Sequence, residues 1–155
     1  MNVDAMPGGM ELFRRYRSRD INVEAEVSDV SGEMIFYEFD EPAVNTFNKE
    51  DAIKSEQKGY RMIKQEPIAI YGVMELFDKY IPQNQVIDVL DVDIEGFDDR
   101  IIEAIDWNKY RPTIVLVEKD EENRNLAFYE NKALSDVGYK MIASTYRTGI
   151  WKREL

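Results

Sequence analysis

The chain of 155 residues contains no cysteine and no histidine. The absence of cysteine excludes disulfides and thiolate metal sites. The absence of histidine removes the commonest general base, the commonest metal ligand and any serine–histidine triad. No apolar run reaches membrane-spanning length, and the N-terminus has no apolar segment of the signal-peptide kind. We therefore expect a cytoplasmic protein with no membrane partner.

Basic residues are also few, since 20 lysines and arginines stand against 31 acidic residues and give a net charge of −11. Such a balance repels polyphosphate, so we expect no nucleic-acid partner. The one basic segment, residues 14–19, is short. We interpret it as the polar face and C-terminal end of a helix, where cations suit the helix dipole.

Length and composition describe one ordinary globular domain spanning residues 1–155. Hydrophobic residues make up 44% of the chain and charged residues 33%, which is far from the composition of a disordered protein. A domain of about 150 residues buries roughly 70% of the surface of its unfolded chain, so a substantial core is expected.

Residues 86–98, V-I-D-V-L-D-V-D-I-E-G-F-D, form the most informative stretch. A mostly apolar run ends at Asp93, Glu95 and Gly96, and a helical spacing of apolar residues then begins. This pattern predicts a strand, a turn and a helix, with carboxylates at the carboxyl end of the strand, where α/β sheets bind ligands. The alternative is that Asp93 and Glu95 are solvated turn and capping residues.

The remaining elements alternate along the chain. Apolar spacing predicts helices over residues 10–17, 49–58, 73–80 and 123–136. It predicts strands over residues 22–27, 34–39, 60–67, 113–117, 139–144 and 149–153, the first two as a hairpin. Together they predict an α/β fold whose sheet is mostly parallel with an antiparallel C-terminal edge.

The order of several short motifs resembles the FkbM-type S-adenosylmethionine-dependent methyltransferases. Besides the central stretch, the similar motifs are I-D-W at 105–107, Y-R-P at 110–112, V-E at 117–118, N-V-D-A at 2–5, D-I-N-V at 20–23, V-S-D at 27–29, G-Y-K at 138–140 and T-Y-R-T at 145–148. The resemblance covers nearly the whole chain and implies a Rossmann-like methyltransferase sheet.

The resemblance also implies site residues for the cofactor, S-adenosylmethionine. Asp4 occupies the place of the acid that binds the ribose hydroxyls, and Ser28 and Asp29 occupy the turn that flanks the adenine. Asp93 and Glu95 occupy the catalytic place, where a carboxylate orients the acceptor hydroxyl or takes its proton. The alternatives are that Asp4, Ser28 and Asp29 are ordinary turn residues.

The resemblance departs at the start of the chain. The family carries a strand, a Gly-rich cofactor turn and a helix ahead of the region that Asn2 matches. Residues 3–9 do not replace that turn, because only one helix and one strand fit between Asp4 and Val27. We therefore expect an N-terminally truncated methyltransferase sheet.

Three functions are compatible with these observations. The first is methyl transfer to a hydroxyl of a small molecule or saccharide. The second is a non-catalytic fragment or partner subunit that is completed by another chain or a homo-oligomer. The third is binding of a divalent metal, or hydrolysis, by Asp88, Asp91, Asp93 and Glu95. We rank the third last, because acidic residues are plentiful throughout the chain.

Overall fold

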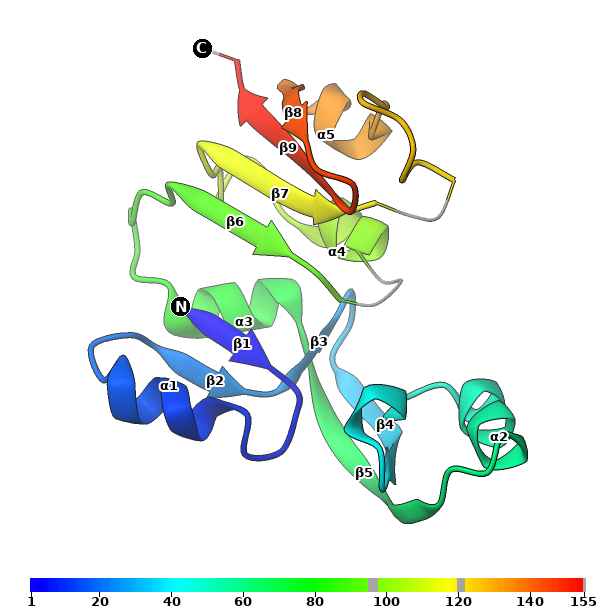
Figure 1. Cartoon of the computed structure of the whole chain (residues 1–155). Coiled ribbons are helices and arrows are strands. Elements are labelled where there is room, and N and C mark those ends of the chain that lie inside the picture. Colours follow the sequence, from blue (N-terminus) through cyan, green and yellow to red (C-terminus); the bar gives the residue numbers. More distant parts are fainter. Residues whose placement is uncertain (95–97, 120–121, 155) are drawn as a thin grey trace. The chain divides into compact units, whose positions relative to one another are not determined.

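The computed structural model describes residues 1–94, 98–119 and 122–154. The chain divides into two compact units, whose elements are labelled in Figure 1. The first unit comprises Met1–Glu26 and Val30–Tyr71, and the second comprises Val27–Asp29 and Gly72–Leu155. Each unit has a cluster of buried apolar side chains of its own.

The first unit begins with a strand, a helix and a parallel strand: β1 (Asn2–Asp4), α1 (Met10–Tyr16) and β2 (Asn22–Glu24). The helix predicted at residues 10–17 is confirmed, with Met10 on its buried side. Asp4 pairs with Glu24 at the carboxyl ends of the two strands. Two neighbouring strands therefore end in acidic residues at the same edge.

The rest of the first unit is organised around an antiparallel pair, β4 (Gly32–Phe39) and β5 (Met62–Gly72). A short 3-10 turn, η1 (Pro42–Val44), and α2 (Lys49–Gln57) connect them. The predicted helix at 49–58 is confirmed. It begins at Asn48, whose side-chain oxygen accepts hydrogen bonds from two backbone N–H groups of the first turn.

The hairpin predicted from residues 22–27 and 34–39 is wrong. The order of that sheet is β3-β5-β4, where β3 is Glu26–Ser28, so β5 separates the two segments. The alternating pattern correctly identified Val23 and Ala25 as buried. It carried no information about the partner strand, because β4 pairs along its whole length with residues about thirty positions further along the chain.

The second unit contains α3, followed by a four-stranded sheet in the order β6-β7-β9-β8. β6 and β7 are parallel and are connected through α4, whereas β9 runs antiparallel to both β7 and β8. The bounds are α3 (Val73–Tyr80), β6 (Val89–Val92), α4 (Asp98–Ala104), β7 (Ile114–Glu118), α5 (Lys132–Asp136), β8 (Tyr139–Ser144) and β9 (Thr148–Arg153). The predicted antiparallel C-terminal edge is present.

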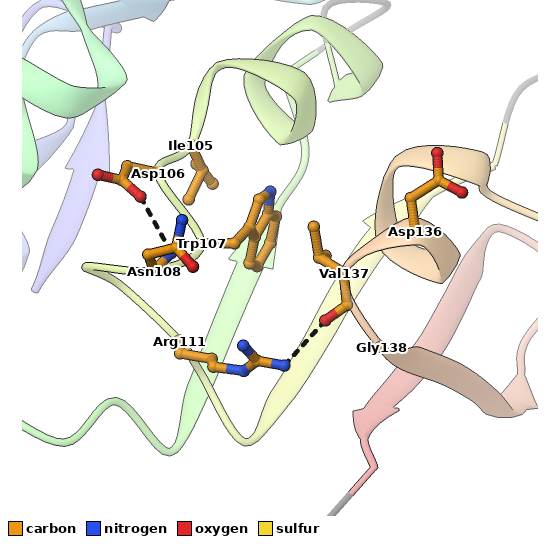
Figure 2. A pocket seen from close by; sticks show the side chains of 8 residues that line it. All are labelled: Ile105, Asp106, Trp107, Asn108, Arg111, Asp136, Val137 and Gly138. Atoms are coloured by element: carbon orange, nitrogen blue, oxygen red, sulfur yellow. Dashed lines mark hydrogen bonds between the residues drawn. The ribbon is translucent and has the colours of Figure 1, made fainter.

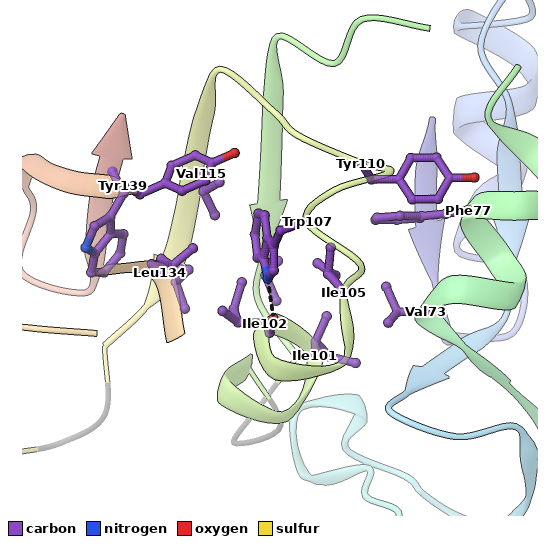
Figure 3. Packing of buried hydrophobic residues seen from close by; sticks show 13 residues of the cluster. Val73, Phe77, Ile101, Ile102, Ile105, Trp107, Tyr110, Val115, Leu134 and Tyr139 are labelled. Carbon is purple, nitrogen blue, oxygen red and sulfur yellow. Dashed lines mark hydrogen bonds between the residues drawn. The ribbon is translucent and has the colours of Figure 1, made fainter. Parts of the chain in front are cut away.

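One buried cluster joins the helices of the second unit to its sheet (Figure 3). Ile102 of α4 and Leu134 of α5 belong to it, together with Val115 of β7. The indole N–H of Trp107 donates to the carbonyl of Ile102 at 3.0 Å, so the polar atom of this buried ring is satisfied. Strand alternation leaves the other side of β6, which carries Val89, exposed.

Gly149 in β9 is required by the packing of Trp151. A Cβ at position 149 would lie 2.3 Å from the indole Cη2 atom, which is far closer than a van der Waals contact. Because Trp151 is buried in the core cluster, its ring cannot swing into solvent to make room. The glycine therefore sets how closely the ring lies on the strand.

Across the described residues the protein is mixed α/β, with three small sheets that include parallel and antiparallel pairs. The sequence predicted one mostly parallel sheet. The helix predicted at 123–136 is shorter than expected and begins at Lys132. Asn131 stops it from extending towards the N-terminus, because its backbone is extended and its side chain caps the helix.

Candidate functional site

Asp4 is the last residue of β1, at the start of the turn that leads to α1. Its carboxylate is exposed and accepts a hydrogen bond from the backbone N–H of Met6 at 2.8 Å. Gly8 has a φ of +79°, and a Cβ on Gly9 would lie 3.0 Å from the Met6 carbonyl oxygen. The backbone of this tight turn therefore requires glycine at both positions. Because the turn presents a carboxylate, it suits the hydroxyls of a ligand and repels an anionic group.

Glu26, which follows β2, is a site residue that sequence reasoning missed. Its side chain is half-buried, and burial together with the nearby charge of Asp4 raises its pKa from 4.5 to about 7. A protonated Glu26 donates a hydrogen bond, and an ionised Asp4 accepts one. The alternation of Glu24 and Glu26 with apolar residues was visible in the sequence, but the proximity of Glu26 to the charge of Asp4 was not.

Ser28 and Asp29 contact each other directly. The Ser28 hydroxyl donates to the Asp29 carboxylate at 2.8 Å. Val27 beside them packs against the core cluster of the second unit. The turn is therefore attached to a buried residue, and it presents a hydroxyl and a carboxylate together.

Asp93 follows directly after β6 and is exposed. The pKa of the nearby Asp91 is raised above its ordinary value, first by the partial burial of Asp91 and then by the negative charge of Asp93. The buried Asp98 accepts a hydrogen bond from the backbone N–H of Ile94 at 3.2 Å, which ties the end of β6 to α4. Glu95, the other predicted catalytic residue, lies outside the described residues.

Each unit places one predicted residue beside another acidic or polar side chain, and in the first unit that neighbour, Glu26, was not predicted. Asp4 lies near Glu26 in the first unit, and Ser28 lies against Asp29 in the second. Within residues 1–94, 98–119 and 122–154 there is no group of three or more acidic side chains arranged to hold a metal ion. The same part of the chain contains no helix with the length and apolar character needed to cross a membrane.

A cavity of about 570 Å³ lies elsewhere in the second unit (Figure 2). The residues that line it are Ile105, Asp106, Trp107, Asn108, Arg111, Asp136, Val137 and Gly138. They precede β7 and β8, so the cavity lies at the amino end of β7, away from Asp93 at the carboxyl end of β6. The Arg111 guanidinium donates to the Val137 carbonyl at 3.0 Å and so ties its loop to the end of α5.

Comparison with known proteins gives one match. A family model described as the Methyltransferase FkbM domain matches residues 7–141. No curated protein and no solved structure matches the chain. Ser28, Asp29, Asp93 and Glu95 fall inside the matched region, and Asp4 lies three residues before it.

Proposed function

The chain belongs to the FkbM methyltransferase family, and from this premise we propose that it transfers a methyl group from S-adenosylmethionine to a hydroxyl of a small-molecule or saccharide acceptor. The family match, which extends through both compact units, is the observation that carries the proposal. The family implies a Rossmann-like methyltransferase fold, and acids at the carboxyl ends of parallel strands agree with it.

Asp4 and Glu26 fit the ribose of the cofactor. One oxygen of Asp4 is held by the Met6 N–H, and its exposed carboxylate accepts from a ribose hydroxyl. Glu26 in its protonated form donates to the neighbouring hydroxyl. In the same proposal the Asp29 carboxylate accepts from the adenine amino group, and Ser28 keeps that carboxylate oriented.

Asp93 acts on the acceptor, together with Glu95. The bound cofactor supplies an electrophilic methyl group. The Asp93 carboxylate would orient the acceptor hydroxyl and take up its proton as the acceptor oxygen is methylated. The exposed position of Asp93 after β6 leaves it open to an acceptor. Alignment of the acceptor oxygen supplies much of the rate enhancement.

Calorimetric titration with S-adenosylmethionine and S-adenosylhomocysteine tests the proposal. We expect wild-type protein to bind both, and Asp4→Ala to bind about 10- to 100-fold more weakly, because it loses hydrogen bonds to a charged group. Asp136→Ala is the matched control, since Asp136 is an exposed aspartate at the end of α5, ion-paired with Lys132. Its affinity should equal that of wild type.

The outcome separates the two functions. Binding that Asp4→Ala weakens supports the enzyme, and an acceptor screen should then show turnover that Asp93→Asn reduces by about 100-fold or more. Absence of binding at millimolar ligand contradicts an independent methyltransferase. It supports instead the second candidate, a subunit that another chain completes.

A further inference from the structure

Lys119 is a buried lysine that the proposed mechanism does not use. It directly follows β7 and is only 2% exposed. Its ammonium donates a hydrogen bond to the carbonyl of Leu126 at 2.8 Å. A lysine ammonium has three N–H donors, and the other two have no acceptor among the residues that the structure describes. Lysine is rarely buried to this degree unless an acidic group pairs with it.

Glu118, which precedes Lys119, pairs with other cations. Its carboxylate lies 3.8 Å from the guanidinium of Arg124 and 3.9 Å from that of Arg147. In the described part of the chain, no acidic side chain forms an ion pair with Lys119. The buried charge therefore needs a counter-ion from elsewhere.

Lys119 stands at the edge of the sheet where the proposed acceptor binds. β6 and β7 run in parallel, and Val92 and Val117 are their last paired residues (Figure 1). Asp93 is the next residue after β6, and Lys119 is the next residue after β7. The backbone N–H of Lys119 donates to the Arg147 carbonyl at 2.6 Å, which fixes its position at this edge. Asp93 and the buried cation thus follow the carboxyl ends of adjacent strands, where α/β sheets bind ligands.

We propose that the Lys119 ammonium binds an anionic group of the acceptor, a carboxylate or a phosphate, while Asp93 holds the hydroxyl that is methylated. The identity of this ligand as an acceptor rests on the proposed methyl transfer. The anionic group supplies the counter-charge and the oxygens for the two remaining N–H donors. Because Asp93 and Lys119 follow adjacent strands, the hydroxyl and the anionic group belong to one small unit, such as a uronic acid or a sugar phosphate.

The loop over Lys119 gives a ligand a route to the ammonium. Residues 122–131 contain no helix or strand, and Leu126 and Phe128 are 47% and 64% exposed. Two backbone carbonyls hold the loop to the sheet: that of Leu126 accepts from Lys119, and that of Ala127 accepts from a serine hydroxyl of β8 at 2.7 Å. A loop with so few buried side chains opens at low cost, and a small displacement exposes the two remaining donors.

NMR titrations of the 15N-labelled protein with three sugars test the proposal. D-glucose, D-glucuronate and D-glucose 6-phosphate share one ring and differ in the group at carbon 6. At constant ionic strength and without cofactor, we expect wild type to bind at least one of the two anions in the millimolar range, at least about tenfold more tightly than glucose. The amide signals of Lys119 and Ala127 should shift. The tighter anion identifies the group as a carboxylate or a phosphate.

Lys119→Met should abolish the preference for the anion, because it keeps an unbranched apolar side chain and removes the charge. Lys152→Met is the matched control. Lys152 is an exposed lysine of β9 that pairs with Ile114 at the opposite end of β7, so this variant should bind the anion like wild type. Thermal melts must show that both variants fold. The comparison of sugars on wild type needs no variant, so it decides the proposal even if Lys119→Met does not fold.

Equal binding of the three sugars, no binding of either anion in the millimolar range, or a preference that Lys119→Met keeps overturns the proposal. Inorganic phosphate that binds as tightly as glucose 6-phosphate also overturns it, since the site then recognises no acceptor. The titrations contain no cofactor, so their result is independent of methyl transfer. A protein that binds glucuronate but not S-adenosylmethionine loses the proposed methyl transfer and keeps the anion site. A protein that binds the cofactor but neither anion keeps the methyl transfer and loses the anion site.

Discussion

Asp4 and Glu26 are both acidic, but their surroundings give them different chemistry. Asp4 is exposed and bound to a backbone N–H, whereas Glu26 is half-buried next to a negative charge. Near neutral pH one of them accepts hydrogen bonds while the other still carries a proton for part of the time. Such a pair can accept from one of two adjacent hydroxyls and donate to the other.

Stability should fall with rising pH because of Glu26. Its folded pKa of about 7 lies above its ordinary value of 4.5, so the folded state keeps a proton that the unfolded state loses between these values. Glu26→Gln removes this penalty. We expect its Tm to exceed that of wild type by about 2–4 °C near pH 8, on the order of 1 kcal/mol after solvent screening, and to equal it near pH 4.

Thermal melts at several pH values make this comparison. Glu33→Gln is the control, since Glu33 is an exposed residue of β4. It should change the Tm little at any pH. A Glu26→Gln melt that parallels wild type from pH 4 to pH 8 would mean that the Glu26 carboxyl is ionised normally.

Gly149→Ala should destabilise the second unit. The added methyl group would lie 2.3 Å from the Trp151 ring, so strand and ring must separate, at a cost of about 2 kcal/mol or more. Gly32→Ala is the matched control, because a Cβ at Gly32 meets nothing within 4 Å. Urea unfolding should show a lower midpoint for the first variant and nearly the wild-type midpoint for the second. Equal midpoints would contradict the predicted clash.

Single site residues could be predicted from the sequence where they belonged to a recognisable motif. Asp4, Ser28, Asp29 and Asp93 were reached through resemblance to a family, and their roles stay predictions. Glu26 had no such motif. Its pKa is raised first by burial and then by the charge of Asp4, more than twenty residues away, which comes close because β1 and β2 pair in parallel.

Helix boundaries were predictable where strong local signals bracket the helix. α3 was predicted at its observed bounds because apolar spacing is regular there and Pro82 follows closely. α5 was predicted too long because Leu126 and Tyr129 continued the apolar spacing by chance. The start of α5 is determined by Asn131, which caps the helix. The spacing of apolar residues gives no information about such a cap.

Asn131→Ala should therefore loosen α5 and its attachment to α4. The buried Asn131 side chain accepts from the Leu134 N–H and donates to the Asp99 carboxylate at 2.9 Å. Losing the cap and this bond should lower the free energy of unfolding by about 1–3 kcal/mol in urea titrations. Asn108→Ala, at an exposed position, is the control and should cost less than about 0.5 kcal/mol. Equal losses would show that the cap is unimportant.

Net charge acts on the whole molecule. With 31 acidic and 20 basic residues, the folded chain repels itself, and added salt screens that repulsion. We expect NaCl at about 500 mM to raise the Tm by a few degrees over about 20 mM. Near pH 5 the rise should shrink, because carboxylates begin to take up protons. A Tm that is constant or falls with salt at neutral pH would contradict this expectation.

The division into two units and three sheets had no signal in the sequence. Strand positions follow from local alternation, but strand partners depend on contacts between distant segments. The pairing of Gly32 with Ile70 at one end and Phe39 with Met62 at the other is such a case. In contrast, β8 and β9 are joined by a short turn, and the antiparallel C-terminal edge that they form was predicted.

Both tryptophans of the chain, Trp107 and Trp151, belong to the buried cluster of the second unit. Intrinsic indole fluorescence therefore reports on that cluster alone, whereas far-ultraviolet dichroism reports on the helices and strands of both units. Coincident transitions by the two signals would mean that the units melt as one cooperative body. Separate transitions would show which unit unfolds first, without the need for an added fluorescent label.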